Sequence, residues 1–153
     1  MTTIEKYRKI VSELIRRSFP VLKSKKIKVI EYNFFHGYAF YLPVINVIGI
    51  NKKCSAFSDK EKKGLLVHEL CHAEQSNNVG FLKNILWFIS YWIFSRKIKK
   101  KTEIEADKLV IKKGYAKNLF VSTKKFESEF EKMRYGFSLK QIKSYAKKIG
   151  KWP

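Results

Sequence analysis

The feature that most constrains this chain is the run Ser58–Gln75, SDKEKKGLLVHELCHAEQ. It opens with Ser58-Asp59-Lys60-Glu61, which matches the S-x-x-E capping box, and the apolar residues Leu65–Val67 follow directly. A capping box before an apolar run marks the beginning of a helix. We therefore expect a helix that begins at Ser58 and carries the rest of this run.

The same run contains the pattern H-E-x-x-H at His68, Glu69 and His72. Two helical residues that are four apart lie about 40° from one another, so both imidazoles can reach one metal ion. Glu69 lies about 100° from His68, where it can face a water on the metal without occupying a ligand position. The pattern thus predicts a metal site with His68 and His72 as ligands and Glu69 as the catalytic base.

The back of this helix is predicted to be buried, because Leu66, Val67 and Leu70 point away from the two histidines. Cys71 is expected to be structural, with a redox-sensitive thiol as the alternative. The only other cysteine is Cys54, so no disulfide framework is indicated and a reducing compartment is favoured.

The remaining periodicities predict an α+β fold in a single domain, residues 1–153. Apolar residues at helical spacing indicate an N-terminal helix over 3–17, ended by Pro20. Residues 26–52 are rich in β-branched and aromatic residues and predict a small, mainly antiparallel sheet of three strands. Three further helices are expected, one from Thr102 to Gly114, one from Ser122 or Thr123 to about Tyr135, and one from Ser138 to Gly150.

A catalytic zinc needs a third protein ligand besides two histidines. His36 is the only other histidine, and its position beside Gly37 fits a turn better than a ligand. Glu103 and Asp107 share a helix face, so one can bind the metal while the other orients a metal-bound histidine. Glu105 points the other way and can close a capping box with Thr102. We therefore expect Glu103 to be the third ligand, supported by Asp107.

HELCH followed by Glu103-Ile104-Glu105-Ala106-Asp107, an E-x-x-A-D pattern, resembles the gluzincin metallopeptidases. The pattern is most similar to the HtpX and CAAX-prenyl-protease branch and to the small minigluzincins, over roughly residues 40–115. The resemblance implies that Glu103 is the third zinc ligand and that Asp107 supports the site from outside. It also implies a three-stranded zincin-like sheet above the motif helix, whose edge strand pairs with the substrate backbone.

The chain differs from these families in several places. It lacks real membrane spans, and it has a long apolar stretch at 81–94 and a longer C-terminal pair of helices. Small relatives can be held latent by a terminal segment, so residues 120–153 are a candidate inhibitory segment. SprT-like proteases are also similar, but they use a third histidine that this chain does not have downstream of His72.

The activity expected from these residues is that of a zinc metalloendopeptidase. A water on zinc, activated by Glu69, would attack the peptide bond, and Glu69 would pass its proton to the leaving amine. Tyr115 is a candidate donor to the oxyanion. The alternatives are a zinc-binding module without catalysis and a basic protein that binds nucleic acid or a membrane surface.

The net charge of +20 invites an anionic partner. However, 28 of the 33 basic residues are lysine, whereas nucleic-acid readers rely on arginine, so a nucleic-acid function is disfavoured. Residues 81–94 followed by the basic run 96–101 could lie on an anionic membrane, or 81–94 could be buried in the fold. No apolar signal core precedes the first helix, which favours a cytoplasmic protein. If residues 81–94 lie on a membrane, the protein would be peripheral at that membrane.

Overall fold

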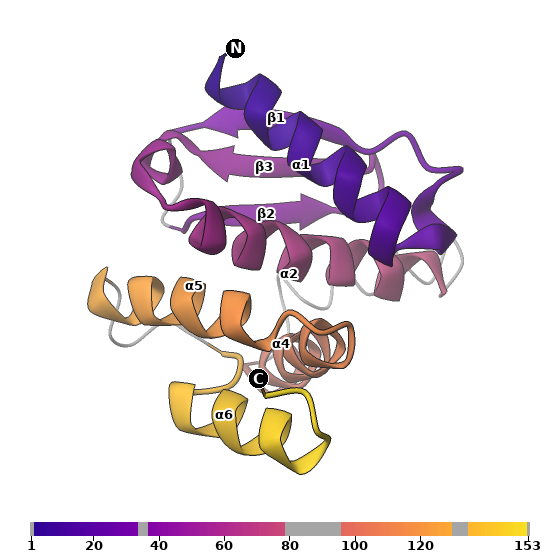
Figure 1. Ribbon diagram of the computed structural model, residues 1–153. Helices are drawn as coiled ribbons and strands as arrows, with labels where there is room; N and C mark the ends of the chain where they lie inside the picture. Colours follow the sequence, from indigo (N-terminus) through magenta and orange to yellow (C-terminus); the bar gives the residue numbers. More distant parts are fainter. Residues whose placement is uncertain (1, 34–36, 79–95, 130–134, 153) are drawn as a thin grey trace.

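The computed structural model of the chain describes residues 2–33, 37–78, 96–129 and 135–152 (Figure 1). Within these ranges it contains five α-helices, three β-strands and two short 3₁₀ turns. The α+β class expected from the sequence is confirmed. The helices are α1 (Thr3–Ser18), α2 (Asp59–Asn77), α4 (Arg96–Lys112), α5 (Ala116–Glu129) and α6 (Leu139–Lys148), and the strands are β1 (Lys28–Tyr32), β2 (Ala39–Leu42) and β3 (Val47–Asn51).

The sheet has the order β1-β3-β2 and is mixed, not mainly antiparallel as predicted. β2 and β3 form an antiparallel pair across a short turn, and β1 pairs with the other side of β3 in parallel. The reason lies in β3, whose five residues are all buried, as a central strand requires. Because β3 occupies the middle, β1 and β2 become the two edges of the sheet.

Helix α2 is the centre of the fold. It contacts α1, β2, α4 and α5, so that it lies between the sheet and the C-terminal helices (Figure 1). The side chains of Leu66, Val67 and Leu70 are completely buried, as predicted for the back of the motif helix. They belong to the same hydrophobic core as Ile48 and Ile50 of β3. The histidine-bearing helix is therefore fixed on several sides by apolar packing.

Two predicted capping boxes are present. Ser58 Oγ accepts the amide of Glu61, and the Glu61 carboxylate accepts the amide of Ser58, at the start of α2. Ser138 and Gln141 make the equivalent pair at the start of α6. Such a box satisfies two amides that the helix itself leaves without partners. Both helices thus begin where the sequence predicts.

The capping box predicted at Thr102 is wrong. Helix α4 begins at Arg96, so Thr102 lies inside it, and Glu105 instead forms an ion pair with Lys108, 2.9 Å away. Helix α5 begins at Ala116, earlier than the predicted Ser122 or Thr123. The Ser122 hydroxyl donates to the Leu119 carbonyl within the helix and does not cap it. A serine can be satisfied in either way, so its presence alone does not locate a helix start.

Two predictions fall on residues outside the described ranges, namely the role of His36 and the burial or membrane contact of residues 81–94. Of the described helices, none combines the length and apolar character that crossing a bilayer would require.

Candidate metal centre

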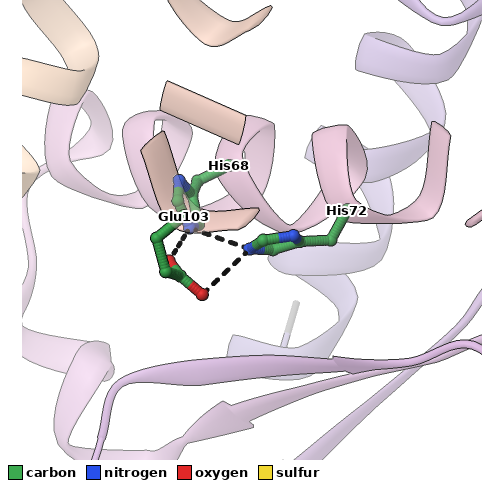
Figure 2. Close-up of side chains that lie close together, drawn as sticks. All are labelled: His68, His72 and Glu103. Carbon is green, nitrogen blue, oxygen red and sulfur yellow. Dashed lines mark hydrogen bonds and ion pairs between the residues drawn. The ribbon is translucent and has the colours of Figure 1, made fainter. Parts of the chain in front are cut away.

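Three predicted ligands come together where α2 and α4 meet (Figure 2). His68 and His72 lie on successive turns of α2, and their Nε2 atoms are 3.1 Å apart. Glu103, on α4, places Oε2 3.0 Å from Nε2 of His68 and Oε1 3.5 Å from Nε2 of His72. A single ion between these atoms could contact all three side chains.

The spacing of the donor atoms can be compared with the geometry of a small metal ion. Ligands at 2.0–2.1 Å from a tetrahedral ion lie about 3.3 Å from one another. The three measured separations are 3.0, 3.1 and 3.5 Å, which bracket this value. Two imidazole nitrogens and one carboxylate also form the donor set of open catalytic sites. The residues present therefore fit a three-ligand metal site.

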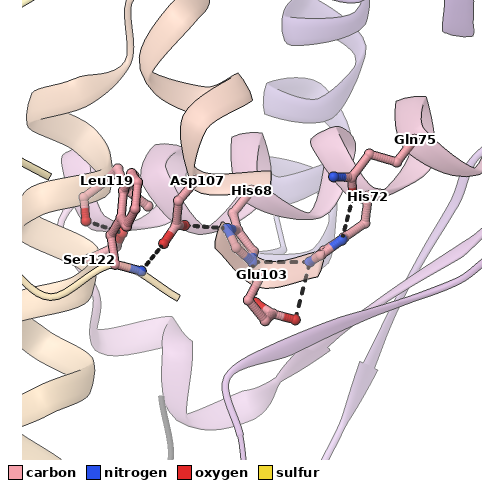
Figure 3. Close-up of polar contacts among 8 residues, drawn as sticks. His68, His72, Gln75, Glu103, Asp107, Leu119 and Ser122 are labelled. Carbon is pink, nitrogen blue, oxygen red and sulfur yellow. Dashed lines mark hydrogen bonds and ion pairs between the residues drawn. The ribbon is translucent and has the colours of Figure 1, made fainter. Parts of the chain in front are cut away.

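Each histidine also makes a polar contact through Nδ1, the ring nitrogen that faces away from the cluster (Figure 3). Nδ1 of His68 lies 3.0 Å from Oδ1 of Asp107, a carboxylate with no exposed surface. Nδ1 of His72 lies 3.0 Å from Oε1 of Gln75, an oxygen that can accept a hydrogen bond from this nitrogen. Both rings are thereby oriented with Nε2 toward the common centre, the arrangement that metal-binding histidines need.

Gln75 was not identified from the sequence. It lies three residues after His72 on the same helix, and residues at this spacing are neighbours on the helix surface. The signal was therefore available, since an amide one turn beyond a metal-binding histidine is placed to accept its Nδ1 proton.

The electrostatics of the cluster follow from burial and close opposite charges. Burial alone would lower the pKa of His68, but hydrogen bonds to Asp107 and Glu103 and their charges outweigh it and raise the pKa to about 10. Burial alone would raise the pKa of Glu103, but His72 and His68 hold it well below its usual range. The histidines and Glu103 thus stabilise one another's charged forms in the cluster.

Glu69, the glutamate of the motif, is also buried. Burial raises its pKa above the ordinary value, although the charges of His68 and His72 oppose the shift. A carboxylate whose pKa is raised toward neutrality accepts and returns a proton more readily than an exposed one. Glu69 is thus a buried carboxyl group whose pKa responds to the charges of both histidines.

The other candidate residues lie away from the cluster. Glu105 is half-exposed and paired with Lys108, so Glu103, and not Glu105, faces the histidines. The hydroxyl of Tyr115 lies 2.6 Å from Oγ of Ser18 at the end of α1, and its ring lies under the ammonium of Lys63. Lys63 is nine residues before His72 on α2, which places it on the opposite side of this helix. Tyr115 is therefore not positioned to donate to an oxyanion at the cluster.

Cys71 is fully buried in the core, and burial raises its pKa well above that of a free thiol. A protonated, inaccessible thiol is a poor nucleophile and a poor metal ligand. These properties fit the structural role predicted for Cys71.

Comparison of the chain with protein-family models, with curated proteins and with solved structures gave no significant match.

Proposed function

We propose that this protein is a zinc-dependent metallopeptidase. The observation that carries the proposal is the convergence of His68, His72 and Glu103 on one point, with each histidine oriented from behind and a buried glutamate next to them. A purely structural ion pair would not need two histidines that both present Nε2 to the same carboxylate. The H-E-x-x-H and E-x-x-A-D patterns support the same reading from the sequence.

Zinc is the metal that the donor set favours. Two imidazoles and a carboxylate leave a fourth position open, as in catalytic zinc sites, whereas calcium and magnesium prefer ligand sets made of oxygen atoms. Zinc bound there would supply a Lewis acid that lowers the pKa of a coordinated water to about 7 and polarises a carbonyl.

The remaining roles belong to residues of the chain. Glu69 would accept the proton of the attacking water and return it to the leaving amine, which its burial and raised pKa favour. Asp107 and Gln75 would keep the two imidazoles in the tautomer that leaves Nε2 free for the metal.

An extended substrate can be placed along β2, an edge strand that packs against α2. The Tyr38 carbonyl accepts the Asn51 amide of β3, so the alternation of antiparallel hydrogen bonds directs the backbone groups of Ala39 and Tyr41 away from β3. These groups can pair with a peptide in the manner of an added strand. We infer that the substrate is an unfolded or extended segment of a protein.

The experiment that tests this function is a comparison of Glu69→Gln with Glu105→Gln. Both replace a glutamate by its amide, but only Glu69 adjoins the cluster, whereas Glu105 faces Lys108. With zinc restored, Glu69→Gln should bind the metal normally and cleave a peptide library about 10²–10⁴-fold more slowly. Glu105→Gln should match the wild type in both properties.

Cleavage by the wild type that persists at full rate in Glu69→Gln would contradict the proposed mechanism. Wild-type protein that carries zinc but cleaves nothing in a broad library would contradict the proposed function and leave a zinc-binding module.

A further inference from the structure

Asp107 connects the candidate metal centre to the last helix of the chain. Its Oδ1 lies 3.0 Å from Nδ1 of His68 (Figure 3). Its Oδ2 accepts the backbone amide of Phe137 at 2.7 Å. Asp107 is completely buried on α4, whereas Phe137 lies just before α6. One carboxylate is therefore shared between a metal-binding histidine and a residue 30 positions further along the chain.

The position of the Phe137 amide is set by the packing of α6. The Phe137 ring is buried, and its centroid lies 5.7 Å from that of Tyr145 on α6. Ile142 and Ala146 of the same helix are also completely buried and belong to the main core. The capping box of Ser138 then fixes the turn directly after Phe137. The packing of α6 therefore holds the Phe137 amide in place.

A buried carboxylate needs donors on both oxygens, because an unsatisfied charged oxygen costs more than a neutral one. The Phe137 amide satisfies Oδ2 and also fixes the rotation of the carboxylate plane. With the plane fixed, Oδ1 stays within 3.0 Å of Nδ1 of His68. If the amide were lost, the carboxylate could rotate away, and His68 would lose the group that orients its ring.

We propose that Phe137 is a positioning residue of the metal centre, acting through its backbone amide and Asp107 on the ring of His68. The inference rests on the proposed metal site. It gives the C-terminal helix a supporting role at that site, in contrast to the inhibitory role that the sequence suggests for residues 120–153. Because coupling between two sites is reciprocal, metal binding should also stabilise the packing of α6.

The test is a pair of variants that differ in one hydrogen-bond donor. Phe137→Ala removes the ring but keeps the amide, whereas Phe137→Pro removes both. The difference between them isolates the amide from the loss of packing. In the metal-free protein, the ¹⁵N and ¹H resonances of the His68 imidazole report the Nδ1 proton directly. We expect Phe137→Ala to retain the wild-type Nδ1–H signal and Phe137→Pro to shift it or broaden it by exchange.

The second readout is zinc affinity by competition with a chelator. Loss of an outer partner of a metal-binding histidine typically weakens metal binding about 10–100-fold. Phe137→Pro should therefore bind zinc at least about 10-fold more weakly than Phe137→Ala. Identical His68 resonances in the two variants would overturn the inference whether or not zinc is bound. Wild-type protein that binds no zinc would overturn the proposed function instead.

A third measurement needs no substitution, which matters if Phe137→Pro does not fold. Hydrogen exchange of the wild-type Phe137 amide should slow on addition of zinc, at least about 10-fold, because the metal fixes His68 and through it Asp107. A control amide in α1, such as that of Val11, should not respond. If the Phe137 amide exchanges at the same rate with and without zinc, the coupling does not exist.

Discussion

Gly64 should be required for the close packing of α2 against α5. A Cβ added at Gly64 would lie 2.2 Å from the Asn118 carbonyl oxygen, 2.6 Å from its carbon and 2.7 Å from Oγ of Ser122. Carbon and oxygen atoms approach to about 3.3–3.6 Å. Since the obstacle is backbone of α5, Gly64→Ala requires the two helices to separate by about 1 Å, a shift estimated from this overlap.

The magnitude follows from two opposing effects. Overpacking of this kind costs about 1–3 kcal/mol, and a backbone obstacle belongs at the upper end of that range. Alanine in place of glycine inside a helix gains about 1 kcal/mol in propensity. The net loss in the free energy of unfolding should be about 2 kcal/mol, or about 4–8 °C in melting temperature for a chain of this length.

Urea unfolding of the metal-free protein, followed by circular dichroism, measures this loss. The exposed residue Ser12, in the middle of α1, offers a control. Ser12→Ala and Ser12→Gly compare the two residues inside a helix without a change of packing, and alanine should be more stable by about 1 kcal/mol. A Gly64→Ala variant that is as stable as the wild type, or more stable, would refute the packing argument.

Three further predictions concern the metal centre. Because the pKa of His68 is about 10 in the metal-free protein, zinc binding at pH 7.5 should release about one proton from this imidazole. Calorimetry in buffers of different ionisation enthalpy measures the proton release, and a binding heat that does not depend on the buffer would contradict the prediction. The same raised pKa stabilises the metal-free fold below pH 6.5, and this contribution should be lost as the pH rises through about 10, which unfolding at several pH values checks. Gln75→Leu removes the acceptor for Nδ1 of His72 and should weaken zinc binding about 10–100-fold, so unchanged affinity in chelator competition would exclude this role.

Much of this fold could be predicted from local signals. The capping boxes at Ser58 and Ser138 locate two helix starts because a side chain and a backbone amide satisfy each other within four residues. Gly114 ends α4 with a positive φ of 89°, a conformation that favours glycine. These signals depend on neighbouring residues alone, which is why the sequence is sufficient to find them.

Features that depend on distant residues were harder to predict. The place of β3 between β1 and β2 depends on burial on both of its faces, and a mainly antiparallel sheet was predicted instead. Thr102 and Glu105 match a capping box although they lie inside the longer helix α4, so the sequence pattern predicts too late a start for this helix. The partner of Tyr115 proved to be Ser18, a contact that sequence spacing cannot reveal.

The candidate site was more predictable than its surroundings. Helical geometry alone places His68 and His72 on one face, and it separates Glu103 and Asp107 from Glu105 on the next helix. The structure places four of these side chains together at the meeting of α2 and α4, namely those of His68, His72, Glu103 and Asp107. The link from Asp107 to Phe137 was not predicted, because it joins a side chain to a backbone amide that has no sequence signature.

The most direct test of the central claim is the zinc content per chain of the purified, zinc-reconstituted protein, measured by mass spectrometry for the wild type, Glu103→Ala and Glu105→Ala. The geometry of the cluster predicts about one zinc in the wild type and in Glu105→Ala, and little in Glu103→Ala. A wild type that takes up no zinc, or a site emptied by Glu105→Ala and not by Glu103→Ala, would contradict this account.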